Sequence, residues 1–438
     1  MLNKIYSLIA RFRHNAFWKS VVILAGGTGL GQLILVVATP ILTRIYDPAD
    51  FGVLTVFVSS LGLLVVIASL RYQIAIPLPE EEDVAANLVV LGMSIVIGFS
   101  VIIGLVVFFA GRRIAELLSA PQLAPYLWLF PFAVLAGGLY QVFIYWHIRK
   151  KRFKRLTQAR VGQSAVLVTT QISLGLLGAG PLGLVGGYVT GQTTAGIMLA
   201  LGMLRERSVF SRVSWEGLKS SGRRYMRFPL ISSWSALLNN GGLQLPPLLF
   251  ATFFGVSVAG LYGLAQRIVA IPVTLIGRSV AQVYLSEASH LYNRNPLALR
   301  QLFLRTATKL FVYVGLPIVL VGLMAPWGFG FLFGEQWKTS GFYIIVLLPM
   351  FLGQIVVMPL SQSLNILERQ DLQLMWDAGR LLAVTLSIGA AHYIFHLQTL
   401  ATIAFYGAVM FVMYVVLFLA IWKQLSLLPA RHSEPHPD

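Results

Sequence analysis

The residues of this chain that could do chemistry are a few arginines that interrupt long apolar stretches. Arg71, Arg267, Arg278 and Arg380 lie within such stretches, Arg44 closes one of them, and Asp377 is the one acidic residue inside them. Charged side chains within apolar segments are rare, and they usually face a partner or a water-filled cavity. Because a guanidinium pairs bidentately with phosphate, this excess of arginine predicts an anionic ligand of the phosphate type.

The spacing of these residues adds two expectations. Arg267 and Arg278 are eleven residues apart, close to three helical turns, so both lie on one helix face. Asp377 and Arg380 are three residues apart, a spacing that permits a local ion pair in which each neutralises the other. The alternative for Asp377 is the binding of a coupling proton or sodium ion.

The composition says which elements must position these residues. Hydrophobic residues make up 57% of the 438 residues and charged residues only 11%, whereas a soluble domain carries about a quarter. A disulfide scaffold, a disordered tail and a cytosolic enzyme are therefore poor interpretations. The chain has no cysteine, which excludes disulfides and thiolate metal sites, and its seven histidines lack metal-binding spacing, so we expect no metal.

These properties predict an all-α integral membrane protein, because a helix of about 20 apolar residues spans a bilayer. Long apolar stretches with few charged residues occupy residues 19–44, 50–71, 84–111, 117–146, 161–204, 228–285, 310–334, 339–367, 372–394 and 399–422. Two of these are long enough for two helices each, with breaks expected at 178–181 and 254–257. We therefore expect about twelve transmembrane helices in two six-helix lobes around a central cavity.

The lobes follow from this count. Residues 1–203 form the N-terminal lobe, residues 204–228 a basic cytoplasmic linker, and residues 229–438 the C-terminal lobe with a short polar tail. A basic segment at residues 4–19 has apolar side chains on one helical face, which suits either an interfacial helix or a solvated positive flank. Residues 26–31 are rich in glycine but lack the lysine of a phosphate loop, so they favour close helix packing.

The net charge of +17 is unevenly distributed between the two sides of the membrane. When the loops are numbered alternately, lysine and arginine gather on one side, at 4–19, 149–155, 205–227 and 294–309, which we call the basic side. The other side has Arg44, Arg112, Arg113 and Lys338. Because such a bias marks the cytoplasmic side, both termini are expected there, and the basic clusters are expected to contact anionic lipid rather than nucleic acid.

Two stretches resemble a known family. The run ILTRIYDPADFG at 41–52, followed by LRY at 70–72, AIPLP at 75–79 and EEE at 80–82, resembles the opening of bacterial polysaccharide and O-antigen flippases. These proteins form the polysaccharide transporter family of the multidrug/oligosaccharidyl-lipid/polysaccharide flippase superfamily. The run GLYGLAQRIVAIPVTLIGRS at 260–279 resembles the eighth helix of that family.

The resemblance implies a flippase of the bacterial inner membrane, not an enzyme, that moves undecaprenyl-pyrophosphate-linked oligosaccharide from the cytoplasmic to the periplasmic leaflet by alternating access. The arginines Arg44, Arg71, Arg267, Arg278 and Arg380 would then bind the pyrophosphate. Asn239, Asn240 and Gln354 are candidates for binding sugar hydroxyls, although polar residues in spans also hold helices together. The resemblance implies no cofactor beyond a proton or sodium gradient, and it implies a polysaccharide polymerase and chain-length proteins as partners.

Three other functions stay open. A lipid II flippase and a cation-coupled multidrug exporter would share the architecture, although residues 1–203 carry no acid inside a span. A membrane glycosyltransferase or polymerase would use acidic residues in an outer loop, where Asp47 and Asp50 lie. Because that loop is only a few residues long, helix capping explains the two aspartates better.

Overall fold

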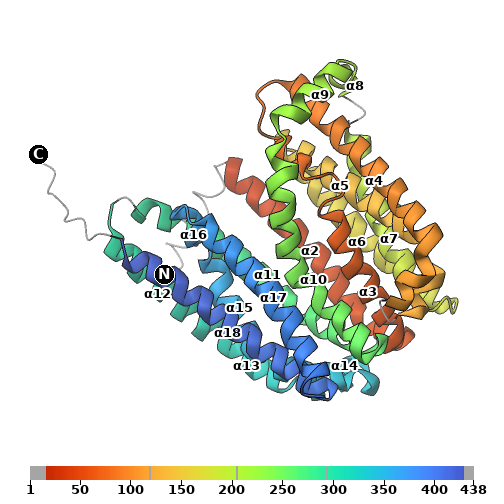
Figure 1. Cartoon of the computed structure of the whole chain (residues 1–438), viewed down its shortest axis with the longest axis vertical. Helices are drawn as coiled ribbons and strands as arrows, with labels where there is room; N and C mark the ends of the chain where they lie inside the picture. Colours follow the sequence, from red (N-terminus) through yellow and green to blue (C-terminus); the bar gives the residue numbers. More distant parts are fainter. Residues whose placement is uncertain (1–15, 118–119, 204–205, 293, 429–438) are drawn as a thin grey trace, which may run out of the picture. The chain divides into compact units, whose positions relative to one another are not determined.

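The computed structural model describes residues 16–117, 120–203, 206–292 and 294–428, and all regular elements in these ranges are helices (Figure 1). This confirms the predicted all-α membrane class. Eight helical segments of the described chain are long and apolar enough to cross a membrane by length and composition alone. Most of the basic segment expected as an interfacial helix, residues 4–15, and the polar tail at 429–438 lie outside the described residues, whereas residues 16–19 open helix α2 (Ala16–Ile45).

The chain divides into two compact units between Asn240 and Gly241, inside helix α10 (Ser233–Phe254). The linker predicted at residues 204–228 precedes this division. The first unit contains six long helices, which are α2 (Ala16–Ile45), α3 (Pro48–Val65), α4 (Glu82–Leu117), α5 (Leu129–Arg149), α6 (Phe153–Leu176) and α7 (Pro181–Met203). Shorter elements of this unit are η1 (Tyr72–Ala75), η2 (Pro121–Tyr126), α8 (Arg207–Phe210), α9 (Trp215–Arg224) and η4 (Phe228–Ser232).

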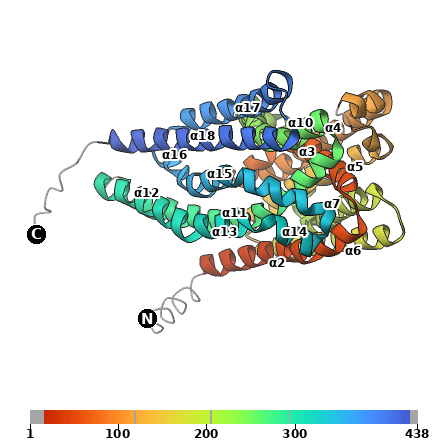
Figure 2. The same cartoon turned by 90° about the horizontal axis from the view of Figure 1, so that it is seen from below.

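The second unit is built around one helix, α15 (Lys338–Leu360), which packs against α11 (Val256–Tyr292), α18 (Thr399–Ser426) and α14 (Ala325–Phe333). Its other elements are α12 (Pro296–Leu310), η5 (Phe311–Gly315), α13 (Leu316–Leu323), η6 (Glu335–Trp337), α16 (Gln362–Ile366) and α17 (Gln370–Tyr393). Figure 2 shows the same helices from below. Over the described residues of both units, twelve helical segments of 18 residues or more agree with the expected number.

The predicted helix breaks lie where the glycines require them. Between α6 and α7, Gly178 and Gly180 have φ angles of +74° and +55°, and between α10 and α11, Gly255 has a φ of +92°. Glycine adopts these left-handed conformations without the steric penalty of a Cβ atom. Both breaks therefore follow from residue type alone.

One predicted helix is wrong. The expected span at 310–334 is replaced by a helical segment at 296–323, formed by α12, the π turn η5 and α13, after which α14 begins at Ala325. The basic residues of 294–309 look like a loop in the sequence, but Arg300, Arg305 and Lys309 belong to an amphipathic helix, and only Arg294 precedes it. Leu299, Phe303, Ala307 and Leu310 form its buried stripe at helical spacing.

Arg300 illustrates why this basic segment is helical. Its guanidinium donates hydrogen bonds to the carbonyl oxygens of Leu425, Ser426 and Leu428, at 2.8, 2.9 and 2.6 Å. Carbonyl groups at the end of a helix lack partners within the helix, and a cation there also complements the helix dipole. Arg300 thus ties α12 to the end of α18.

Glycines allow the helices of the first unit to approach closely. Gly183, Gly187 and Gly191 recur every four residues along α7 and face α6. A Cβ atom at Gly187 would lie 2.9 Å from the carbonyl oxygen of Leu167, too close for a real side chain. The glycine-rich stretch 26–31 lies within α2, where Gly31 faces the Ser164 hydroxyl of α6. This confirms that the stretch packs helices.

Candidate functional site

Arg71 does not lie within a helix, contrary to the prediction. Helix α3 ends at Val65, and Arg71 precedes η1 with a φ of +64°, next to Leu70 at +48°. Two successive non-glycine residues in the left-handed region are strained, and such strain persists only where surrounding contacts fix it. Tyr72 supplies one such contact, since its hydroxyl donates to the carbonyl oxygen of Gly222 at 2.9 Å.

The Arg71 side chain is half-buried. Its Nε atom is buried, and among the described residues it has no hydrogen-bond acceptor. A buried donor of this kind is costly unless a ligand or water satisfies it. Arg71 therefore remains a candidate for anion binding, although from a turn rather than from a helix.

Arg44 lies in the last turn of α2 and is exposed, as expected for a residue at the outer end of the first helix. Beyond it, Asp47 and Asp50 form a capping box at the start of α3. The Asp50 amide donates to Asp47 Oδ1 at 2.8 Å, and the Asp47 amide donates to Asp50 Oδ2 at 3.3 Å. The predicted capping role of these aspartates is confirmed, and it accounts for both carboxylates without catalysis.

Arg267 and Arg278 lie on one helix, α11, about 16 Å apart along its axis at 1.5 Å per residue. Pro272 lies between them without ending the helix. The Arg267 side chain is half-buried, whereas that of Arg278 is exposed. Within the described residues, neither forms an ion pair with a carboxylate. Two cationic side chains thus lie on a long apolar helix of the second unit without an ion-pair partner among the described carboxylates.

Asp377 and Arg380 form the ion pair that their spacing permits. Arg380 Nη2 lies 3.3 Å from Asp377 Oδ1, and the two side chains are only 2% and 5% exposed. The guanidinium lies 4.8 Å from the centre of the Trp376 ring, and Gln373 donates to Asp377 Oδ2 at 3.3 Å. Gly242 of α10 leaves room for this group, because a Cβ atom there would lie 3.1 Å from Arg380 Cζ.

The residues considered for sugar binding lie in different units. Asn239 and Asn240 are half-buried on the part of α10 that belongs to the first unit, and Asn240 donates to the Ala236 carbonyl of its own helix at 3.2 Å. Gln354 is half-buried on α15 of the second unit. The structure brings Asp377 and Arg380 into direct contact, and it places the other candidates on separate elements, apart from Arg267 with Arg278 and Asn239 with Asn240.

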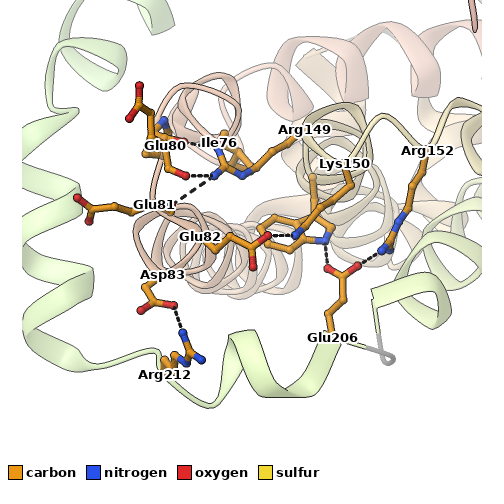
Figure 3. A network of polar contacts seen from close by, with 12 residues as sticks. Ile76, Glu80, Glu81, Glu82, Asp83, Arg149, Lys150, Arg152, Glu206 and Arg212 are labelled. Atoms are coloured by element: carbon orange, nitrogen blue, oxygen red, sulfur yellow. Dashed lines mark hydrogen bonds and ion pairs between the residues drawn. The ribbon is translucent and has the colours of Figure 1, made fainter. Parts of the chain in front are cut away.

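A polar network at the basic side of the first unit was not predicted from the sequence (Figure 3). The Arg149 guanidinium donates to four backbone carbonyls of the loop before α4, those of Ile76, Pro79, Glu80 and Glu81. Beside it, Lys150 pairs with Glu82. Some of the basic loop residues that were expected to contact lipid thus bind backbone carbonyls or a carboxylate within the protein instead.

The network continues to the segment after α7. Glu206 pairs with Arg152 and accepts a hydrogen bond at 2.9 Å from the indole nitrogen of Trp146, which is fully buried. Arg212 Nη1 lies 3.5 Å from Asp83 Oδ1. The complementary acidic run at 80–83 and basic run at 149–155 are the sequence signal that would have indicated these contacts.

Residues 41–341 match the model of a family described as polysaccharide biosynthesis protein. The chain is 32% identical over 161 residues to the teichuronic acid biosynthesis protein TuaB of Bacillus subtilis (strain 168), which covers 36% of this chain and 32% of TuaB. It is 24% identical over 308 residues to the succinoglycan biosynthesis transport protein ExoT of Rhizobium meliloti (strain 1021), covering 69% and 60%. The chain thus spans less than two thirds of the length of either relative.

Solved structures share the fold. An inward-facing multidrug resistance MATE family transporter of the MOP superfamily aligns with a TM-score of 0.67 at 18% identity, covering 92% of this chain and 94% of that one. A MOP superfamily transporter from Pyrococcus furiosus, whose binding pocket is described as having reverse polarity, aligns with a TM-score of 0.59 at 17% identity, covering 93% and 96%. At these identities the likeness concerns the fold alone.

Proposed function

We propose that this chain is a flippase for lipid-linked oligosaccharides, because it belongs to the polysaccharide biosynthesis protein family and has the fold of a multi-pass membrane transporter. Its substrate would be an oligosaccharide joined to undecaprenyl pyrophosphate. The flippase would move this substrate from the cytoplasmic to the periplasmic leaflet of the bacterial inner membrane by alternating access. The basic side, with both termini, would face the cytoplasm.

The observation that carries this proposal is the half-buried Arg267 on α11. The helix is 37 residues long and apolar enough to cross a membrane, and in the described chain no carboxylate pairs with Arg267. A cation in hydrocarbon without a counter-charge is costly. An anionic substrate such as a pyrophosphate supplies that counter-charge, and a guanidinium binds it through two parallel hydrogen bonds.

The remaining arginines have unequal support for this role. Arg71 offers a buried donor, and Arg278 offers an exposed cation on the same helix as Arg267. Arg380 already pairs with Asp377, so it would bind pyrophosphate only by sharing that carboxylate. Arg44 is exposed at a helix end, where it would meet the head group near the outer surface. Asn239, Asn240 and Gln354 would contact the sugars.

Energy input and partners are part of the proposal. A proton or sodium gradient would drive transport through Asp377, in which case the ion pair with Arg380 would open and close during the cycle. A polysaccharide polymerase and chain-length proteins would receive the product. No further cofactor is proposed.

The test uses purified protein in liposomes that contain undecaprenyl-pyrophosphate-linked oligosaccharide in the inner leaflet. Arg267→Ala is expected to abolish the appearance of saccharide on the outer leaflet, and Arg267→Lys to restore it only partly, because lysine lacks the planar fork. Arg112→Ala is the matched control, since this arginine is 91% exposed and pairs only with Glu116 in the described structure.

Three results would contradict the proposal. Full translocation by Arg267→Ala would remove its central support. Export of cationic drugs by the wild-type protein, with no movement of the lipid-linked saccharide, would favour the multidrug exporter. Formation of glycosidic bonds by the purified protein would favour the glycosyltransferase.

A further inference from the structure

The basic side of the first unit carries cations in two different situations. Arg149, Lys150, Arg152 and Arg212 are engaged with carboxylates or carbonyl oxygens (Figure 3). On the neighbouring helix α9, the described structure pairs none of Lys219, Arg223 and Arg224 with a carboxylate. Arg224 has an aromatic neighbour, since its guanidinium lies 5.5 Å from the centre of the Tyr225 ring. These three cations therefore keep their hydrogen-bond donors available for an anion.

Helix α9 is held firmly against α4 by its other face. Ser214 caps its start by accepting from the Gly217 amide at 3.0 Å, and the Ser214 amide lies 3.4 Å from Asn87 Oδ1 of α4. Gly217 packs directly on Asn87, because a Cβ atom there would lie 2.6 Å from the Asn87 amide nitrogen. Ser221, one turn later, is buried. These contacts determine which face of α9 is exposed.

The exposed face borders an open cleft of about 440 Å³, whose described lining consists of α9 side chains alone, those of Glu216, Lys219, Ser220, Arg223 and Arg224. Three cations and one carboxylate give this lining a net charge of +2. Lys219 and Arg223 are four residues apart, so their side chains lie about 5–6 Å apart at their bases. That spacing suits two adjacent anionic groups better than one.

We propose that this cleft binds the pyrophosphate of the lipid-linked saccharide on the basic side before the substrate enters the transport site. The inference rests on the proposed function, which makes the basic side the loading side. A pyrophosphate that carries two negative charges matches the net charge of the lining, and the two arginines offer planar donors for its oxygens. The anchored helix holds these donors in place before the substrate arrives, which lowers the entropy lost on binding.

A general attraction to anionic lipid is the competing explanation, because basic segments near membranes bind such lipid without any cleft. The two explanations predict different effects of where on the protein a cation is removed. Surface attraction depends on the number of cations removed from the basic side, whereas a pyrophosphate site depends on which ones are removed. Arg305 and Lys309 provide the matched pair, since both are exposed on α12 and unpaired with carboxylates in the described structure.

The experiment places full-length protein in phosphatidylcholine nanodiscs and measures binding of undecaprenyl pyrophosphate by native mass spectrometry. Arg223→Gln/Arg224→Gln is expected to weaken binding about tenfold or more, because each charge-assisted hydrogen bond contributes strongly. Arg305→Gln/Lys309→Gln removes the same charge and is expected to leave binding within about twofold of wild type. Arg223→Lys/Arg224→Lys should recover binding in part and serves, with melting temperatures of all variants, as the control for folding.

Several outcomes would overturn the inference. Equal losses in the two glutamine pairs, or displacement of the probe by phosphatidylglycerol at the same concentration, would indicate surface attraction. Unchanged binding in Arg223→Gln/Arg224→Gln would exclude the cleft. In the liposome assay a loading site predicts a higher half-saturating substrate concentration with an unchanged maximal rate. Absence of translocation by the wild-type protein would instead refute the proposed function. The nanodisc measurement would still show whether the cleft binds undecaprenyl pyrophosphate.

Discussion

Replacing Asp377 by leucine is expected to destabilise the second unit more than replacing Asp377 and Arg380 together. The two side chains are almost fully buried and lie 3.3 Å apart on α17. Asp377→Leu would leave the Arg380 guanidinium in an apolar interior without this carboxylate. Asp377→Leu/Arg380→Met would remove both charges and keep the volume nearly constant.

The size of the difference follows from the geometry. At 3.3 Å and an effective dielectric constant of about 20, the attraction between the two charges is about 5 kcal/mol. Breaking a buried pair by removing one partner costs about 3–5 kcal/mol, whereas replacing both partners by apolar residues is often neutral or stabilising. We therefore expect the single variant to lose about 3–5 kcal/mol and the double variant much less. The coupling free energy between the two positions should be about 2 kcal/mol or more.

The measurement is the free energy of unfolding of wild type, both single variants and the double variant in mixed micelles, followed by circular dichroism. Additive losses in the double variant would refute the conclusion that the pair is one energetic unit. The folded double variant also separates the two roles considered for Asp377. If its flipping activity survives and still depends on a pH gradient, neither pyrophosphate binding by Arg380 nor ion coupling by Asp377 stands.

Two further predictions concern packing in the first unit. Gly187→Ala should lower the melting temperature and cost about 1–3 kcal/mol, because its Cβ atom would press on the backbone of α6, whereas Gly186→Ala should be neutral, since its nearest contact would be Leu174 Cδ1 at 3.7 Å. Glu206→Ala should cost about 1–3 kcal/mol by leaving the buried Trp146 indole without its acceptor and Arg152 without its partner, and it should speed tryptic cleavage near α9. Glu116→Ala, which breaks an exposed pair, should change the free energy of unfolding by at most about 1 kcal/mol. Equal effects of Glu206→Ala and Glu116→Ala would show that the network does not hold the segment.

The sequence predicted correctly those features that depend only on residues close to one another in the chain. The break between α6 and α7 follows from Gly178 and Gly180, which adopt positive φ angles, and the start of α3 follows from the Asp47 cap. The Asp377–Arg380 contact follows from a spacing within one helix. In each case the determining contacts lie within a few residues of one another, so the sequence contains all the information required.

The end of α3 had no such signal. Neither glycine nor proline occurs between Val65 and Arg71, and the prediction extended the helix to Arg71. One contact that holds this segment is the hydrogen bond from Tyr72 to Gly222, 150 residues away. The amphipathic α12 was missed for a related reason, since basic residues divide the apolar stripe that identifies it, and one of them, Arg300, binds the end of α18. Long-range contacts of this kind depend on packing between elements.

The count of basic residues in a loop does not predict what those residues do. The clusters at 149–155 and 205–227 are alike in composition, yet Arg149, Lys150 and Arg152 are engaged within the protein, whereas Lys219 and Arg223 line an open cleft. Glu82 of the acidic run at 80–83 pairs with Lys150, Glu206 pairs with Arg152, and Asp83 pairs with Arg212 just before α9. The start of α9 is held on α4 by the contacts of Ser214 and Gly217 with Asn87, so the cations that lack a carboxylate partner in the described structure face outward. The acidic run would therefore act on anion binding indirectly. Neutralising Asp83 should loosen the segment before α9 and weaken pyrophosphate binding, although the net positive charge of this surface would rise.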